Sequence, residues 1–291
     1  KHHLPVRIRG KLTGDMPQAG ENTVELVKKA LAGFLGCNLP QEEETVLPKL
    51  PVRPPVLCAG CPHRASFYAV KRAMKGKKAV FSGDIGCYTL GNAQPLDMVD
   101  TCLCMGAGIT IAQGLHRVEP DAVNFAFIGD STFFHTGIPG VINAVYNETD
   151  IVLIVLDNST TAMTGHQPHP GTGKTMMGEI SQKVDIAAIL QAIGVKCIRK
   201  ANPLHLQEAE EAVREAAAFQ GVSAVIFESP CIAVTTPARI LRVDTEKCTG
   251  CKRCIRELGC PAMSIKDGKV LIDPSTCYGC TICAQVCPFD A

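Results

Sequence analysis

The feature that most constrains this chain is a pair of cysteine runs near its C-terminal end. The runs lie in two similar halves, 244–265 and 273–291, which form an internal repeat, and each run ends in Cys-Pro. The first run is Cys248-x2-Cys251-x2-Cys254-x5-Cys260, and the second is Cys277-x2-Cys280-x2-Cys283-x3-Cys287. So short a repeat cannot build a sufficient apolar core, so we expect bound metal to hold it together.

The second run has the spacing of bacterial two-cluster ferredoxins. Three thiolates on one tight loop bind three irons of a 4Fe–4S cubane, and the fourth ligand comes from the other run. One predicted cluster therefore uses Cys248, Cys251, Cys254 and Cys287, and the other uses Cys277, Cys280, Cys283 and Cys260. Two extra residues before Cys260 leave a three-iron centre open, and a zinc ribbon is the alternative because zinc also uses Cys-x2-Cys pairs.

The bulk composition indicates a soluble globular protein. The chain has 291 residues, 46% of them hydrophobic and 20% charged, with a formal net charge of +1, so we expect neither a nucleic-acid nor a membrane partner. No secretion signal or apolar run of roughly 18 residues is present, which predicts a cytoplasmic protein with metal-bound cysteines. The chain lacks an initial Met, and we interpret it as a piece of a longer polypeptide.

Sixteen cysteines are present, and four of them fall outside the patterns that follow here. Cys37, Cys102, Cys104 and Cys197 are expected to be small buried apolar residues.

The rest of the chain indicates three regions. Residues 1–56 read as the tail of a preceding domain and a linker, with a helix over Val24–Leu35 and prolines and acidic residues over 38–56. Residues 57–240 alternate short apolar runs with helical patterns, and 241–291 hold the cysteine repeat. The alternation predicts a parallel α/β sheet covered on both faces, followed by a small ferredoxin-like α+β domain.

Within the alternating region the expected strands and helices are specific. The strands are expected at Ala79–Phe81, Val123–Ile128, Ile151–Leu156 and Ala224–Phe227. The helices are expected at Ala65–Met74, Gly106–Val118, Ile138–Tyr146, Ile186–Ile193 and Leu204–Phe219. Ligand chemistry in such a fold belongs to the loops after the carboxyl ends of the strands.

Two of these strand ends carry oxygen donors. Gly129-Asp130-Ser131 ends one strand, and Asp157-Asn158 ends the next, 28 residues after Asp130. The pattern resembles the thiamine-diphosphate motif, Gly-Asp-Gly followed by Asn, with Ser131 and Asp157 as departures. Mg²⁺ prefers oxygen ligands, and Asp130, Asn158 and the Thr160 carbonyl would supply three. A helix beginning after Thr136 would turn its N-terminus toward the diphosphate.

Other interpretations of the glycine-rich segments were weighed. Gly-Asp-Ser and Asp-Asn are also ordinary turn sequences. Gly173-Lys174-Thr175 resembles the end of a P-loop, but position 168 is Pro where the first Gly is required. Gly106-Ala107-Gly108 lacks the third Gly of a dinucleotide fingerprint.

From residue 55 to 291 the chain resembles the C-terminal half of the large subunit of 2-oxoacid:ferredoxin oxidoreductases. The resemblance is carried by the two cysteine runs and by these segments: Cys58-Ala-Gly-Cys61-Pro-His63-Arg64, Gly83-Asp84-Ile85-Gly86-Cys87-Tyr88, Cys104-Met105-Gly106-Ala107, Gly129-Asp130 and Asn158-Ser-Thr-Thr-Ala-Met-Thr-Gly-His-Gln167.

The resemblance implies further site residues. A third, proximal 4Fe–4S cluster would use Cys58, Cys61, Cys87 and Cys231; from spacing alone, Cys58 and Cys61 could equally bind zinc or form a redox pair. The cofactor would contact Gly83, Asp84, Cys87, Met105, Gly106, Gly129, Asp130, Ser131, Asn158 and Thr160. His63 and His166 are the candidate catalytic residues, whereas His169 is as readily a structural or solvated histidine.

The resemblance also implies the reaction. An aryl 2-oxoacid such as indolepyruvate, coenzyme A and oxidised ferredoxin would give aryl-acetyl-CoA, CO₂ and reduced ferredoxin. The partners would be the preceding half of the same subunit, whose glutamate activates the cofactor, and a smaller subunit. The alternatives are pyruvate or 2-oxoglutarate as the substrate, or a non-catalytic iron–sulfur electron-transfer subunit.

Overall fold

The structure is a computed structural model that describes residues 6–39, 50–237 and 239–291. The chain separates into two compact units, Lys1–Arg53 and Pro54–Ala291. The first unit holds a 3-10 turn, η1 (Lys11–Thr13), and helix α1 (Val24–Leu35), which confirms the predicted helix. Thr23 caps α1 by accepting a hydrogen bond from Leu26 N at 3.3 Å. Residues 40–49 of the predicted linker lie outside the described residues.

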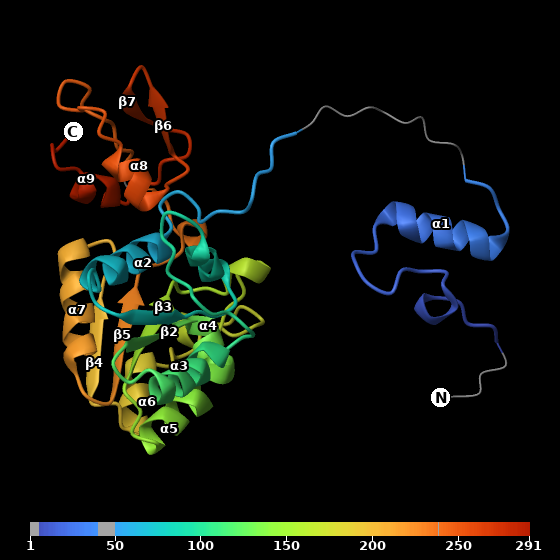
Figure 1. Cartoon of the computed structure of the whole chain (residues 1–291), viewed down its shortest axis with the longest axis horizontal. Coiled ribbons are helices and arrows are strands. Elements are labelled where there is room, and N and C mark those ends of the chain that lie inside the picture. The colour runs from blue at the N-terminus through green and yellow to red at the C-terminus, as the bar shows by residue number, and fades with distance from the viewer. Residues whose placement is uncertain (1–5, 40–49, 238) are drawn as a thin grey trace. The chain divides into compact units, whose positions relative to one another are not determined.

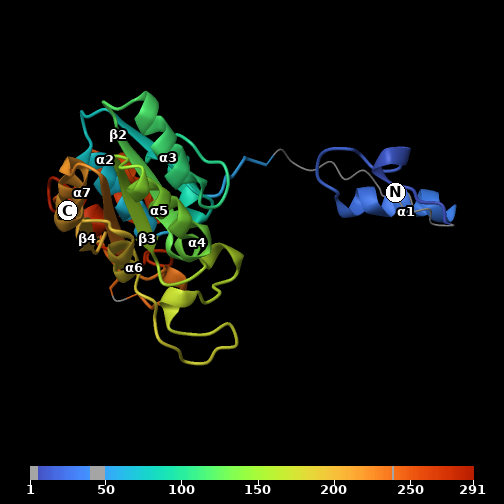
Figure 2. The ribbon, with the colours of Figure 1, turned by 90° about the horizontal axis from the view of Figure 1, so that it is seen from below.

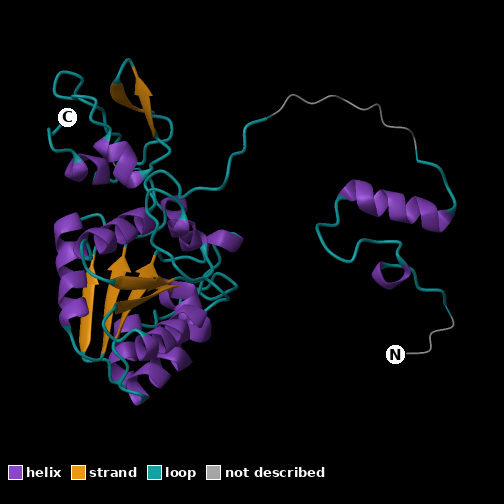
Figure 3. Cartoon of the chain, in the orientation of Figure 1, coloured by secondary structure: helices purple, strands orange, loops and turns teal. Residues whose placement is uncertain are grey.

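The second unit is built on a five-stranded parallel sheet (Figures 1 and 3). Its strands run in the order β1-β2-β3-β5-β4, and every neighbouring pair is parallel. Their bounds are β1 (Ala79–Ser82), β2 (Val123–Gly129), β3 (Ile151–Asp157), β4 (Cys197–Ala201) and β5 (Val222–Glu228). The four predicted strands are present, each within two residues of its expected bounds at either end.

Strand β4 was missed from the sequence. It lies at the edge of the sheet, beside β5, and its centre carries the exposed side chains of Arg199 and Lys200. A charged edge strand lacks the apolar run by which buried parallel strands are recognised.

Helices cover both faces of the sheet (Figure 2). One face is covered by α2 (Pro62–Ala73) and α7 (Leu206–Ala218), and the other by α3 (Ala107–Val118), α5 (Ile138–Tyr146) and α6 (Ile186–Ile193). Successive residues of a strand point to opposite faces, so Phe127 of β2 packs under α2 while Ile128 packs under α3 and α5. The predicted covering of both faces is therefore confirmed.

The C-terminal part is a small cysteine-rich module. It contains α8 (Arg253–Leu258), the antiparallel pair β6 (Met263–Lys266) and β7 (Lys269–Ile272), and α9 (Ile282–Val286). Helix α8 lies against α2, where Tyr68 donates a hydrogen bond to Glu257 (Figure 1). Gln285 of α9 accepts a hydrogen bond from Leu206 N at 3.0 Å, so the module is also fastened to the start of α7.

The remaining helical segments are short and lie in loops. They are η2 (Cys87–Asn92), α4 (Asp130–Thr132), the π-helical turn η3 (Phe133–Gly137), η4 (Ala162–Thr164), η5 (Pro170–Thr172) and η6 (Ile232–Val234). Segments α4, η3 and α5 follow one another without a break, so the helix expected after Thr136 already begins at Asp130. None of the helices in the described ranges is long and apolar enough to cross a membrane.

The four cysteines outside the motifs behave differently from one another. Cys197 is buried in β4 as predicted. The same prediction is wrong for Cys37, Cys102 and Cys104, which are exposed. Cys37 follows the end of α1, and the other two lie in the loop before α3, where no apolar layer covers them.

Candidate functional site

A cavity of about 140 Å³ lies beyond the carboxyl ends of β2 and β3. Parallel pairing sets Gly129 beside Leu156, so the residues that follow the two strands meet at one edge of the sheet. The lining of the cavity includes these residues from the predicted site: His63, Cys87, Met105, Gly129, Asp130, Ser131, Asn158 and Thr160. Tyr88, Thr161 and Met163 add to the wall, although sequence reasoning assigned them no role.

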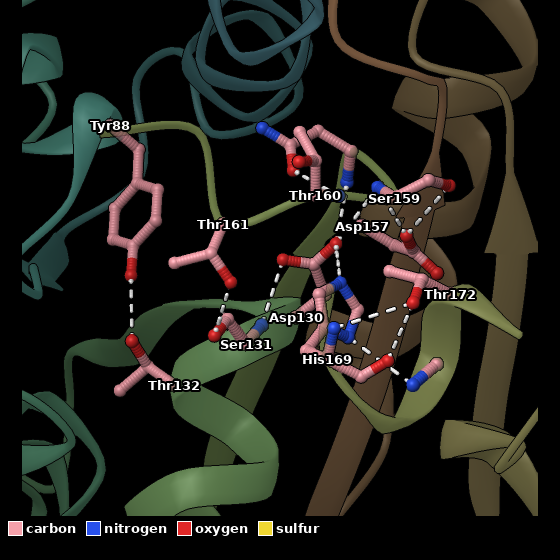
Figure 4. Close-up of polar contacts among 12 residues, drawn as sticks. Tyr88, Asp130, Ser131, Thr132, Asp157, Ser159, Thr160, Thr161, His169 and Thr172 are labelled. Atoms are coloured by element: carbon pink, nitrogen blue, oxygen red, sulfur yellow. Dashed lines mark hydrogen bonds and ion pairs between the residues drawn. The ribbon is translucent and has the colours of Figure 1, made fainter. Parts of the chain in front are cut away.

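Asp130 is the buried centre of this site (Figure 4). Its Oδ1 accepts a hydrogen bond from Ser131 N at 2.8 Å, and its Oδ2 accepts from Asn158 N at 3.1 Å and Ser159 N at 2.8 Å. The backbone after β3 is thus folded around the carboxylate that directly follows β2, at the first residue of α4. His169 Nε2 also lies 3.1 Å from Oδ2, on a buried ring. The sequence left His169 open between solvent and structure, and the fold places it against Asp130.

The oxygen donors of the site fit a hard cation. Asp130, Asn158 and Thr160 are all buried along one wall, and Mg²⁺ prefers such carboxylate, amide and carbonyl oxygens. Burial and the neighbouring Asp130 charge raise the pKa of Asp157 to about 6. The half-buried Asp157 therefore lies close enough to Asp130 for the two carboxyl groups to repel each other when both are charged, and a nearby cation would lessen that repulsion.

His63 is held neutral within the wall. Burial lowers the pKa of its imidazole to about 4, although the Asp130 carboxylate acts in the opposite direction. Its Nε2 lies 3.2 Å from Asn158 Nδ2, and it packs edge-on against Tyr88 with 5.5 Å between ring centres. Because the Asn158 amide donates to Nε2, the ring proton belongs on Nδ1.

His166 is not brought into the cavity. Its backbone has a φ of 63° and its side chain is exposed, while its N–H donates to Thr161 O at 3.0 Å. The described structure therefore joins one of the two predicted catalytic histidines to the cavity and leaves the other on the surrounding loop.

Asp84 supports the cavity from behind. Its buried carboxylate accepts a hydrogen bond from Tyr88 OH at 2.9 Å and another from Gly106 N at 2.6 Å. Burial raises the pKa of Asp84. Gly106 holds a φ of 83° at the start of α3, which a side chain would strain. The sequence predicted that Gly83, Asp84 and Gly106 contact the cofactor. In the structure they do not line the cavity but lie behind its wall.

The four cysteines predicted for a proximal cluster come from three segments near this cavity: the Cys58–Cys61 turn, the start of η2 at Cys87, and Cys231 after β5. Burial, and after it the nearby sulfurs of Cys231 and Cys58, raise the pKa of Cys87. Burial also raises the pKa of Cys61 to about 12. Cys231 N donates to Asn158 O at 2.9 Å, so this cysteine is fastened to a predicted magnesium ligand.

The eight cysteines of the module surround two cavities. One is lined by Cys248, Cys251, Cys254, Cys283 and Cys287, and the other by Cys61, Cys260, Cys277, Cys280 and Cys283. Burial and the neighbouring cysteines raise the pKa of Cys283 to about 12. A bound iron would favour the deprotonated form of this side chain. Within the described ranges no group of three or more His, Cys, Asp or Glu side chains has the spacing to hold a single metal ion.

A glycine allows the second run to turn so tightly. Gly279 has a φ of 79°, and a Cβ there would lie 1.6 Å from Arg239 O. The loop between Cys277 and Cys280 can pass this backbone only because position 279 has no side chain.

A parallel sheet with oxygen donors at its strand ends and a two-run cysteine module defines a thiamine diphosphate enzyme domain joined to an iron–sulfur module. The family model for a thiamine pyrophosphate enzyme C-terminal TPP binding domain matches residues 84–227, and a 4Fe-4S dicluster domain model matches residues 240–288. The chain belongs to the 2-oxoacid:ferredoxin oxidoreductase family.

Individual relatives agree with this assignment. Indolepyruvate oxidoreductase subunit IorA of Methanothermobacter marburgensis is 44% identical over 99% of this chain and 47% of its own length. The 2-oxoglutarate synthase subunit KorB of Archaeoglobus fulgidus is 30% identical over 61% of this chain and 70% of its own length. The chain spans about half the length of the IorA relatives it matches.

A solved structure shares the fold. The 2-oxoglutarate:ferredoxin oxidoreductase of Magnetococcus marinus, determined with 2-oxoglutarate, coenzyme A and succinyl-CoA bound, superposes with a TM-score of 0.54 and 17% identity. The match covers 80% of this chain and 86% of that one.

Replacing Tyr88 by Phe should destabilise the domain by about 1–3 kcal/mol, because the buried Asp84 carboxylate then loses a donor. Urea denaturation of the iron-loaded protein measures the change. Tyr146→Phe is the control, since that side chain is 83% exposed and should leave the free energy of unfolding unchanged. Equal stability of the two variants would contradict the supporting role of Tyr88.

Proposed function

We propose that this chain contributes the diphosphate-binding and electron-transfer parts of an oxidoreductase that converts aryl 2-oxoacids to aryl-acetyl-CoA and CO₂ with ferredoxin as electron acceptor. The observation that carries the proposal is that cysteines of the predicted proximal cluster lie beside the predicted magnesium ligands. Cys87 lines the same cavity as Asp130 and Asn158, and the Cys231 backbone is bonded to Asn158. An oxidation that passes electrons from a bound cofactor to an iron–sulfur centre needs this adjacency.

Indolepyruvate is the substrate we favour. The relative that aligns with 99% of this chain at 44% identity carries that substrate in its name, whereas the 2-oxoglutarate synthase subunit aligns with 61% at 30%. Pyruvate and 2-oxoglutarate remain the competing substrates. A purely electron-transferring role is disfavoured because the buried oxygen donors Asp130 and Asn158 are both present at the cavity.

Asp130, Asn158 and the Thr160 carbonyl would hold Mg²⁺, and the ion would in turn anchor the diphosphate. The helical stretch that begins at Asp130 presents its N-terminal end to the same place, which favours a phosphate group. Thiamine diphosphate, when bound, supplies the nucleophilic carbon and the electron sink that decarboxylation of a 2-oxoacid requires. Ile85, Met105 and Met163 are exposed apolar residues of the lining that would pack against an aryl side chain and lose water on binding it.

His63 is placed to hold a proton without carrying a charge. With Nε2 accepting from Asn158, the Nδ1–H is the donor left for a substrate or for the chain. A neutral donor is suited to a negatively charged oxoacid site, because its own pKa of about 4 keeps it in one state at neutral pH. His169 is a positioning residue in this proposal, since it contacts Asp130 and does not line the cavity.

Three 4Fe–4S centres would take the electrons. Cys58, Cys61, Cys87 and Cys231 would hold the proximal one, and the two module sets would hold the others. Free thiolates of this kind persist in a reducing compartment, which supports a cytoplasmic location. The proposed partners are coenzyme A, ferredoxin, the preceding half of the same subunit and a smaller subunit. The IorA relatives are named as subunits and are about twice as long as this chain, which supports further partners.

The first test concerns the magnesium site. Asp130→Ala should abolish retention of thiamine diphosphate, because it removes the only charged ligand of the three. Fluorescence titration of the cofactor measures this, and the iron–sulfur absorption should persist. Ser131→Gly is the control; it loses one hydrogen bond, from Thr161 Oγ1 at 2.8 Å, and should still bind the cofactor. Normal binding by Asp130→Ala would refute the site.

The second test concerns the metal. Protein purified without oxygen should contain about twelve irons if all three sets hold cubanes. Cys277→Ser should remove about one cluster and leave cofactor binding intact, as measured by iron and sulfide analysis. Cys197→Ser is the control, because that buried cysteine belongs to none of the three sets. Zinc in place of iron would contradict the assignment.

The third test concerns the substrate. The assembled enzyme, with all its subunits, should reduce ferredoxin or a viologen dye with the highest kcat/KM on indolepyruvate, then phenylpyruvate, and far less on pyruvate and 2-oxoglutarate. The apolar wall is the physical reason for this order. A preference for pyruvate or 2-oxoglutarate would overturn the substrate, and no turnover of any 2-oxoacid would overturn the proposed reaction.

A further inference from the structure

Arg64 is a buried cation without a carboxylate partner. Its residue is 6% exposed, yet no Asp or Glu oxygen lies within 4.0 Å of the guanidinium among the residues that the structure describes. Its Nε atom makes no hydrogen bond, and the other two nitrogens donate only to backbone carbonyls. A buried charge is expected to be paired, so something else must balance this one.

The hydrogen bonds of Arg64 join two parts of the second unit. Nη1 donates to Leu258 O at 2.5 Å and Gly259 O at 3.1 Å, directly before Cys260. Nη2 donates to Leu57 O at 2.5 Å and Cys58 O at 3.4 Å. One guanidinium therefore ties the backbone of a proximal cysteine to the backbone beside a module cysteine.

The groups around Arg64 that could carry negative charge are cysteine sulfurs from both sets. The charges that favour its protonated form are those of Cys260, Cys61, Cys280 and Cys58, although burial alone lowers the pKa of the guanidinium. Arg64 also lines the cavity that Cys61 shares with the module cysteines Cys260, Cys277, Cys280 and Cys283. This cavity is the place where the proximal set and one module set meet.

We propose that Arg64 is the shared counter-ion of these two cysteine sets, and that it sets the reduction potential of the iron–sulfur centres they hold. The inference rests on the proposed iron–sulfur function. Each transfer moves one electron, so that one centre is oxidised by one electron as its neighbour is reduced by one. A fixed cation in a low-dielectric interior favours the more negative, reduced state and raises the potential.

The choice of arginine follows from the geometry. A planar guanidinium with several donors in a fixed fork can bind carbonyls on both sides at once. A lysine at position 64 would keep the charge but could not hold both carbonyl pairs. The charge and the fork are therefore separable by substitution.

The test is an EPR-monitored redox titration of the assembled, iron-loaded enzyme. Arg64→Met should shift the midpoint potential of at least one cluster to a lower value, because the cation is lost. Arg64→Lys should leave the potentials closer to wild type. Arg242→Met is the matched control: it removes the same charge from an exposed side chain that lines the other module cavity, where water screens it, and should shift little.

Each outcome decides the proposal. Unchanged potentials in an Arg64→Met protein with its full iron content would overturn it and leave Arg64 a structural bridge. If Arg64→Met loses iron, comparison of Arg64→Lys with Arg64→Gln decides. Iron retained by Lys and lost by Gln supports a required charge, whereas iron retained by both with equal midpoint potentials refutes it. Wild-type enzyme without iron–sulfur centres or oxoacid turnover would instead refute the proposed function itself.

Discussion

The parallel pairing of β2 with β3 is the constraint on which the site depends. It brings Asp130 and Asn158, 28 residues apart in the chain, to the same edge of the sheet. Once there, the Asp130 carboxylate accepts backbone N–H groups of Asn158 and Ser159 and so holds the second loop against the first. The sheet is stable because both faces are covered, with Phe127 and Ile128 fully buried on opposite sides.

A few hydrogen bonds hold the cysteine-bearing segments against the carboxyl ends of the strands. Cys231 follows β5, and its backbone N–H donates a hydrogen bond to Asn158 O. Cys87 is the first residue of η2, which also contributes Tyr88 to the cavity wall. The module is fastened by Arg64 to α8 and by Gln285 to the start of α7. Of the proximal cysteines, Cys87 lines the strand-end cavity and Cys61 lines a cavity of the module, so the set reaches both places.

A small number of buried or half-buried ionisable side chains determine the electrostatics of the site. Asp130 and Asp84 are buried carboxyl groups and Asp157 is half-buried, and burial raises the pKa of Asp157 and of Asp84. Asp84 is satisfied by Tyr88 and Gly106, and Asp130 by the backbone N–H groups of Ser131, Asn158 and Ser159. Arg64 differs from both, because among the described residues this buried cation has no carboxylate partner, and a bound anionic group would balance its charge.

The sequence by itself determined the helix and strand order, the covered parallel sheet and the two cysteine runs, because these rest on local periodicity and on spacing along the chain. It also named Asp130 and Asn158, since turn residues at strand ends are visible in the pattern. Only the tertiary structure decided that His63 lines the cavity while His166 does not, that Asp84 stands behind the wall, and that His169 faces Asp130. Contacts of this kind depend on how loops fold across the sheet, which no local period encodes. Strand β4 was missed for a different reason, because its charged centre at the edge of the sheet leaves no apolar run to recognise.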